Sequence, residues 1–110
     1  MLNDLTIGSG AQQCVFLHGL FGQGKNFTTV AKSLTAADPS LSCWLLDLPN
    51  HGRSAWTQDT SYPTLAAQIA TAIADLAPDR PVTLIGHSMG GKVAMMVALT
   101  RPDLVERLVV

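Results

Sequence analysis

The sequence has little charge and no long apolar run. Only 14% of its 110 residues are charged, the net charge is -1, and the few lysines and arginines are scattered. A chain without a basic stripe cannot neutralise a row of phosphates, which argues against nucleic acid as a partner. No stretch approaches the roughly 20 apolar residues that span a bilayer, and the first residues do not have the pattern of a signal peptide. We therefore expect a soluble cytoplasmic protein.

Cysteine is also scarce. The chain has two cysteines, which are too few for a disulfide framework or a zinc site. Cys14 and Cys43 each lie in an apolar, strand-like run, where a thiol acts as a small hydrophobe. We expect both to be buried, reduced and unreactive, and we expect neither a metal nor a cofactor.

Apolar residues, in contrast, make up 47% of the chain. Continuous apolar runs, typical of strands buried on both faces, occupy residues 14–17, 43–46 and 82–85. Apolar residues at helical spacing predict helices over residues 27–34, 64–76 and 90–100. The last of these is apolar nearly all round, so we expect it to be the most buried. The alternation predicts an α/β domain, with a mostly parallel sheet and helices on both faces.

The two ends of the chain carry further strand signals. Residues 5–7 lead through Gly8-Ser9-Gly10 toward the first buried run, which predicts a hairpin. Residues 104–110 read as a strand with no turn behind it. Without repeats or linkers, residues 1–110 are predicted to form one partial domain. We expect the natural protein to continue beyond them.

A serine motif follows the third buried run. Gly86-His87-Ser88-Met89-Gly90 matches G-x-S-x-G between a strand and a helix, the context of a nucleophile elbow. So sharp a turn forces Ser88 into a strained backbone conformation, and glycine at positions 86 and 90 avoids collisions. We predict Ser88 as the nucleophile and the Met89 N–H as an oxyanion-hole donor. The His87 side chain should diverge from Ser88 across the turn, so we do not expect it to be the base.

A glycine-rich loop follows the first buried run. It reads His18-Gly19-Leu20-Phe21-Gly22, where hydrolases of this architecture place a second oxyanion donor. The Leu20 N–H is the candidate for that donor, and Phe21 is the candidate for lining an acyl pocket. The alternative is a plain glycine-rich turn that His18 braces.

A third loop follows the second buried run. Residues 47–54 are rich in turn formers. Asp47 and His51 suggest a proton relay, but we expect these two residues and Arg53 to stitch a tight loop through local hydrogen bonds.

Together these loops resemble the α/β-hydrolase superfamily, and most of all its small esterase group. The residues that carry the resemblance are 18–22, 47–54, 86–92 and 101–108. The resemblance implies Ser88 as nucleophile and the backbone N–H groups of Leu20 and Met89 as oxyanion donors. It places the catalytic acid, the histidine and the lid after the point where this chain ends.

These observations predict a serine hydrolase that cleaves small-molecule acyl esters through an acyl-enzyme on Ser88. A serine without its base is a weak nucleophile, so the 110 residues alone should be nearly inactive. Thioesterase, lactonase, carbon–carbon hydrolase and acyltransferase activities share the same serine machinery and remain alternatives. Serine at the elbow argues against dehalogenases and epoxide hydrolases, which resemble this chain in fold but use aspartate there.

Two readings outside hydrolysis also remain. Residues 19–25 and 86–92 each fit G-x-x-x-x-G-K, the start of a phosphate-binding loop. Asn26 and Val93 stand where such a loop needs Ser or Thr to hold magnesium, which argues against nucleotide binding. A non-catalytic binding module with a hydrolase-like fold is the other reading.

Overall fold

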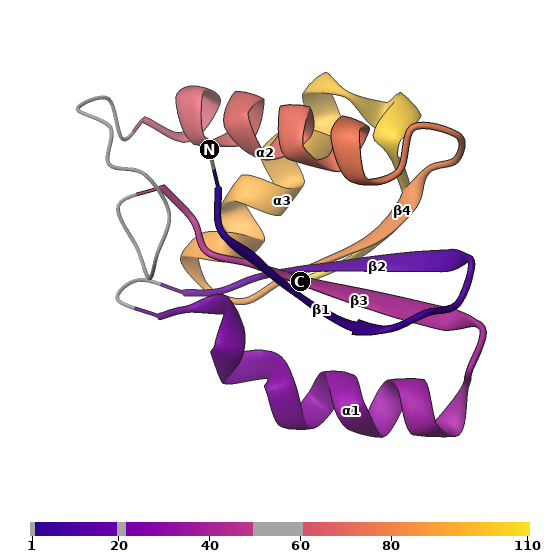
Figure 1. Ribbon diagram of the computed structural model, residues 1–110. Coiled ribbons are helices and arrows are strands. Elements are labelled where there is room, and N and C mark those ends of the chain that lie inside the picture. The colour runs from indigo at the N-terminus through magenta and orange to yellow at the C-terminus, as the bar shows by residue number, and fades with distance from the viewer. Residues whose placement is uncertain (1, 20–21, 50–60) are drawn as a thin grey trace.

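The computed structural model describes residues 2–19, 22–49 and 61–110. It is an α/β structure in which one twisted sheet lies between α1 on one side and α2 and α3 on the other (Figure 1). The elements in chain order are β1 (Asp4–Gly8), β2 (Gln12–Leu17), the 3-10 turn η1 (Gly24–Phe27), α1 (Thr28–Ala37), β3 (Leu41–Leu46), α2 (Tyr62–Leu76), β4 (Val82–Gly86), α3 (Met89–Thr100), the 3-10 turn η2 (Pro102–Leu104) and β5 (Val105–Val109). The predicted class, a mostly parallel sheet with helices on both faces, is confirmed.

The sheet has the strand order β1-β3-β2-β4-β5, and its pairs are parallel except β1 with β3. Strands β2, β3 and β4 correspond to the three predicted apolar runs, each extended by one or two residues. Residues 14–17 of β2 are all buried. The continuous runs thus reflect a sheet that is covered on both faces.

The predicted hairpin at the start of the chain is wrong. Strand β1 runs antiparallel to β3, with Asp4 opposite Leu46 and Gly8 opposite Ser42. Strand β2 cannot pair with β1 because both of its edges are occupied, by β3 and by β4. The Gly8-Ser9-Gly10 segment therefore carries the chain past β3, and Gly8 has a φ of 91° that favours glycine.

Helix α2 forms most of the larger core, and its predicted apolar stripe is confirmed. The helix begins at Tyr62 with Pro63 in its first turn, where the missing N–H is tolerated. Its buried residues are Leu65, Ala66, Ile69, Ala70 and Ile73, which pack with β2, β4 and α3.

Helix α3 was expected to be the most buried, and five of its 12 residues are buried, against five of 15 in α2 and one of 10 in α1. Its apolar residues are not buried all round, however. Leu99 is 79% exposed and Met95 is 41% exposed. One side of the helix packs against α2 and the sheet, whereas the Leu99 side faces solvent in the described part of the chain. Strand β5, predicted as residues 104–110, forms an edge of the sheet and is mostly exposed. No helix within the described ranges is long and apolar enough to cross a bilayer.

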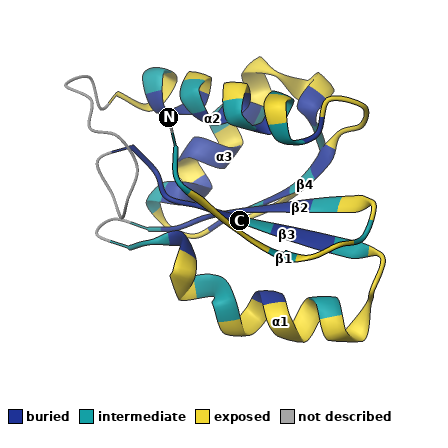
Figure 2. Cartoon of the chain, in the orientation of Figure 1, coloured by how far each residue is buried: buried dark blue, intermediate teal, exposed yellow. Residues whose placement is uncertain are grey.

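Helix α1 covers a smaller core on the opposite face. The predicted helix over residues 27–34 is present, but Phe27 belongs to η1 and the helix continues to Ala37. Only Ala31 is fully buried, while Val30 and Leu34 of the predicted apolar face are 49% and 37% exposed. Figure 2 shows this contrast between an exposed helix and the buried strands above it. Helix α1 is thus a light cover for its side of the sheet.

The two cysteines lie in this smaller core. Cys14 of β2 is directly opposite Cys43 of β3 in the parallel register, and both are buried free thiols, as predicted. Burial raises the pKa of the Cys43 thiol from 9.0 to about 11, with Cys14 contributing through its charge and a hydrogen bond. Burial also raises the pKa of Cys14. Both thiols are therefore protonated at neutral pH.

Replacing Ile73 by Ala should lower the free energy of unfolding of the full chain by about 2–5 kcal/mol, because it leaves a cavity between α2 and the sheet. Leu99→Ala is the matched control on α3, and its effect should stay within about 0.5 kcal/mol because Leu99 is exposed. Urea unfolding of both variants measures the difference. Equal losses would contradict the packing described here.

The buried thiols should also make the fold sensitive to alkali. The pKa of the Cys43 thiol is 9.0 in an unfolded chain and about 11 in the fold. Between these two pH values the unfolded state therefore binds fewer protons than the folded state. The free energy of unfolding should therefore fall as the pH rises through this window. Urea unfolding across that range, compared with Cys43→Ala, measures the effect. A variant that declines as steeply as the parent would refute it.

Candidate active site

Two turns meet at the carboxyl ends of the adjacent strands β2 and β4. Leu17, the last residue of β2, is in register with Gly86, the last residue of β4. Just beyond them, the His87 N–H donates to the Leu17 carbonyl over 3.0 Å. A Cβ built on Gly19 would lie 3.3 Å from the Ser88 Cβ. The loop after β2 therefore touches the serine turn after β4.

Ser88 lies between the end of β4 and the start of α3. Its φ of 56° and ψ of -116° make it the one non-glycine residue with positive φ among those that the structure describes. Such a conformation costs on the order of 1–3 kcal/mol and persists only where its surroundings enforce it. The Gly90 N–H bonds to the His87 carbonyl over 3.0 Å, and the Lys92 N–H bonds to the Ser88 carbonyl over 3.2 Å. These bonds hold the turn, and the serine is exposed at its tip.

The two flanking glycines are required by close backbone approaches, as the sequence indicated. A Cβ on Gly90 would lie 2.3 Å from the Leu17 carbonyl oxygen. A Cβ on Gly86 would lie 2.4 Å from the Gly90 carbonyl oxygen. Both distances are far inside van der Waals contact, so a larger residue would push α3 away from β2 and β4.

His18 braces the loop after β2 from within the protein. The side chain is only 2% exposed. Its Nε2 accepts the Leu48 N–H over 2.9 Å, and its Nδ1 lies 2.7 Å from the Gly19 carbonyl oxygen. Because Nε2 is an acceptor, the proton sits on Nδ1 and donates to that carbonyl, so the ring is neutral. His18 therefore braces this loop, the role that the alternative reading of the sequence gave it.

Asp47 holds the other end of the same loop. Its Oδ1 accepts the Gly24 N–H over 2.7 Å, and its Oδ2 accepts Asn3 Nδ2 over 2.9 Å. These bonds join segments far apart in the sequence. The local bonds predicted within residues 47–54 stay a prediction, because residues 50–54 lie outside the described residues. No sequence signal marked Asn3 as a partner. His51 and Arg53 lie outside the described residues.

Of the remaining predicted site residues, the structure describes Met89 and His87 but not Leu20 and Phe21. Met89 is the first residue of α3, and its N–H has no backbone acceptor among the described residues. Leu20 and Phe21 lie outside the described residues. His87 is exposed, and within the described ranges its ring makes no hydrogen bond to Ser88. No group of three possible metal ligands occurs in the described segments.

Comparison with known proteins gives matches over nearly the whole chain. A family model for the alpha/beta hydrolase fold matches residues 15–110. The sn-1-specific diacylglycerol lipase ABHD11 of Danio rerio is 47% identical over 108 residues, which are 97% of this chain and 33% of that protein. The chain spans about a third of the length of the curated relatives it matches.

Solved structures with the same architecture are also similar in sequence. A marine microorganism esterase superposes with a TM-score of 0.88 at 34% identity, covering 97% of this chain and 40% of that one. A thioesterase domain from the curacin biosynthetic pathway superposes with a TM-score of 0.85 at 32% identity, covering 96% of this chain and 38% of that one.

Replacing His18 by Phe tests the brace with little change in volume. The variant leaves the buried Leu48 N–H without its acceptor, which should cost about 1–3 kcal/mol of unfolding free energy. Hydrogen exchange of the Leu48 amide in the full chain should become faster than in the parent. The His87→Phe variant is the control, since His87 is exposed. Unchanged protection of Leu48 in the His18 variant would contradict the assigned bond.

Proposed function

The chain belongs to the α/β-hydrolase fold family, and from this premise we propose that it carries the nucleophile half of a serine hydrolase that cleaves carboxylic esters. Ser88 is the proposed nucleophile. The strained Ser88 backbone, at the tip of a strand-to-helix turn, carries the proposal more than any other observation. A buried or helical serine would not be presented to a substrate, whereas Ser88 is exposed beside a second glycine-rich loop.

The proposed oxyanion hole lies between the two turns. The Met89 N–H begins α3, where the unpaired amides of a helix N-terminus favour negative charge. Leu20 directly follows Gly19, which contacts Ser88, and its N–H is the second proposed donor. Preorganised donors of this kind stabilise the charge that develops on a carbonyl oxygen during attack. Phe21, in the same loop, is proposed to contact the acyl chain.

The proposed reaction proceeds through a covalent intermediate. Ser88 Oγ gives its proton to a base and attacks the ester carbonyl carbon, and the two backbone amides hold the resulting oxyanion. The protonated base then gives its proton to the alkoxide, which leaves as the alcohol, and the acyl group stays on Ser88. Water, activated by the same base, then attacks the acyl-enzyme and releases the carboxylic acid.

The base for this reaction is proposed to come from outside residues 1–110. Both ring nitrogens of His18 are engaged in holding the loop, so it is not available to Ser88. His87 directly follows β4, and its backbone N–H is bonded to the Leu17 carbonyl. We assign it no catalytic role. This chain matches about a third of the length of its relatives. The other two thirds of such a protein can supply the acid and the histidine.

Oxygen esters of small molecules are the proposed substrates, in the cytoplasm. Two of the matched proteins are named as a lipase and an esterase, which supports this class of substrate. Thioester cleavage is the second candidate, supported by the similarity to a thioesterase domain. The hydrolase-family match covers both glycine-rich stretches, residues 19–25 and 86–92, which supports hydrolysis over phosphate binding.

In the complete protein that contains residues 1–110 and the proposed base, replacing Ser88 by Ala should abolish covalent labelling by a fluorophosphonate. It should also lower kcat/KM for a chromogenic short-chain ester by about 10⁴-fold or more, because the nucleophile is lost. Ser33→Ala, an exposed serine on α1, is the matched control and should label normally. Labelling that survives in the Ser88 variant would refute the nucleophile assignment.

A further inference from the structure

The two cysteine thiols face each other beneath α1. Cys14 and Cys43 are register partners on the adjacent parallel strands β2 and β3, so their side chains leave the sheet on the same face. Cys14 is 7% exposed and Cys43 is fully buried, and both pack with Phe16, Ala31 and Leu45. The proposed hydrolase mechanism uses neither thiol.

The two thiols differ in burial, because Cys14 is 7% exposed and Cys43 is not exposed at all. Burial raises the pKa of both thiols, so neither ionises at neutral pH while the core stays closed. Any reagent that enters this core should react with Cys14 first.

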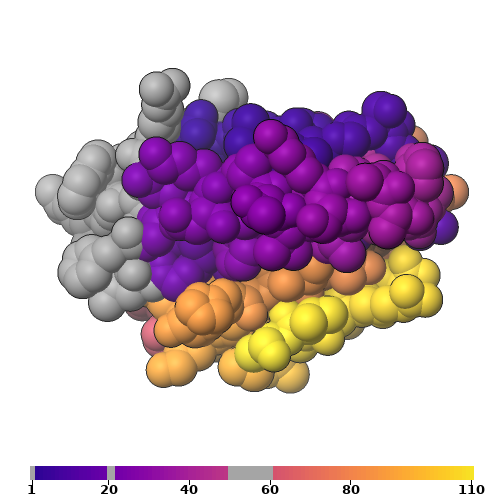
Figure 3. Space-filling model, turned by 90° about the horizontal axis from the view of Figure 1, so that it is seen from below, coloured from indigo at the N-terminus to yellow at the C-terminus, as the bar shows by residue number. Residues whose placement is uncertain are grey.

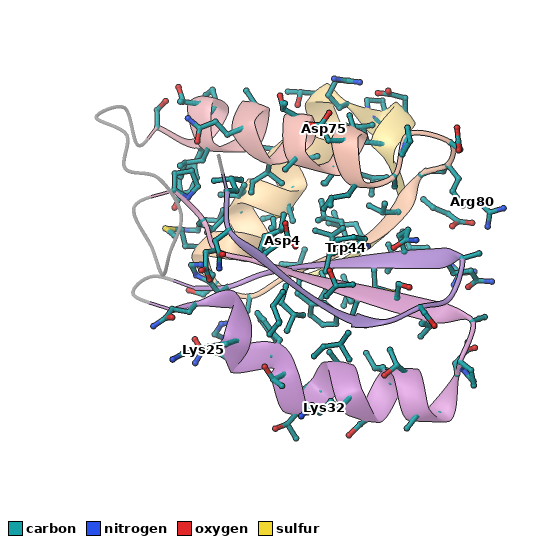
Figure 4. All side chains as sticks on the ribbon, viewed as in Figure 1. Asp4, Lys25, Lys32, Trp44, Asp75 and Arg80 are labelled. Carbon is teal, nitrogen blue, oxygen red and sulfur yellow. The ribbon has the colours of Figure 1, made fainter. Side chains whose placement is uncertain are left out.

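Helix α1 is the barrier between the pair and solvent. Figure 3, which views the molecule from the α1 side, shows this helix lying across the sheet. It is anchored by one fully buried residue, Ala31, and by Phe27 just before it, whose ring lies 5.2 Å from that of Phe16. Lys32, labelled in Figure 4, is an exposed residue of this helix. Segments with so few buried contacts open more readily than the core strands.

We propose that Cys14 and Cys43 form a reversible oxidation site, which hydroperoxides convert to a disulfide between β2 and β3 when α1 opens. The Cys14 thiol releases its proton and the thiolate attacks one peroxide oxygen, so that the O–O bond breaks and hydroxide leaves. The hydroxide takes up the released proton, which gives a sulfenic acid on Cys14 and one water. Cys43 sulfur then attacks the Cys14 sulfur and expels the hydroxyl group, which leaves as a second water after taking the Cys43 proton. Two thiols and one hydrogen peroxide thus give one disulfide and two waters.

The strand geometry makes this disulfide feasible but strained. Neighbouring strands lie about 4.8 Å apart, which is within the Cα separation of disulfide-bonded cysteines. The Cβ atoms of a disulfide approach to about 3.8 Å, so β2 and β3 must draw together locally. Strained disulfides are reduced more easily than relaxed ones. Mild thiols should therefore restore the pair.

Peroxide treatment of the native full chain tests the site. We expect an intact mass lower by two hydrogens, a linked Cys14–Cys43 peptide after tryptic cleavage at Lys25 and Lys32, and full reversal by dithiothreitol. Cys43→Ala should instead accumulate a dimedone-reactive sulfenic acid on Cys14, with no link. If the native protein gives only unlinked oxidation products, or reacts only after unfolding in urea, the site does not exist.

A second pair of variants tests the role of α1. Ala31→Gly weakens this helix and should speed disulfide formation about fivefold, the factor that corresponds to the helix-propensity difference between Ala and Gly. Ala67→Gly makes the same change at an exposed position of α2, on the other face of the sheet, and should leave the rate unchanged. Equal rates in the two variants would overturn the assignment of α1 as the barrier.

Discussion

The parallel pairing of β2 with β4 is the constraint on which the site depends. Because Leu17 is in register with Gly86, the chain leaves both strands at the same level of the sheet. The His87 N–H extends the pairing into the turn, and Gly90 then passes close to the Leu17 carbonyl. These close approaches restrict the backbone of the turn. Within it Ser88 has a positive φ and is exposed.

The loop beside Ser88 is fixed by polar groups that are buried at the end of β3. His18 links this loop to Leu48, and Asp47 links it to Gly24 and to Asn3 before β1. Buried polar groups are costly unless they are bonded, so each of these contacts favours one arrangement of the loop. The described ends of this loop are thus held by residues next to β1, β2 and β3, and not by its glycines alone.

The two faces of the sheet are covered unequally. Helices α2 and α3 bury a large apolar core with β2 and β4, whereas α1 rests on its face through few buried residues. The larger core packs against the strand and helix that flank the serine turn, where it supports the strained backbone of Ser88. The lighter cover lies over the two thiols, where local opening gives access to chemistry that the larger core would exclude.

The sequence alone determined the class of fold, the strands β2, β3 and β4, the helix α2 and the serine turn, because continuous apolar runs, helical periodicity and paired glycines are local signals. It could not determine that β1 pairs with β3, that one side of α3 stays exposed, or that Asp47 reaches Gly24 and Asn3. These features depend on which edges and faces are already occupied when distant segments meet. The opposition of Cys14 and Cys43 has the same origin, since only the register of two parallel strands places them face to face.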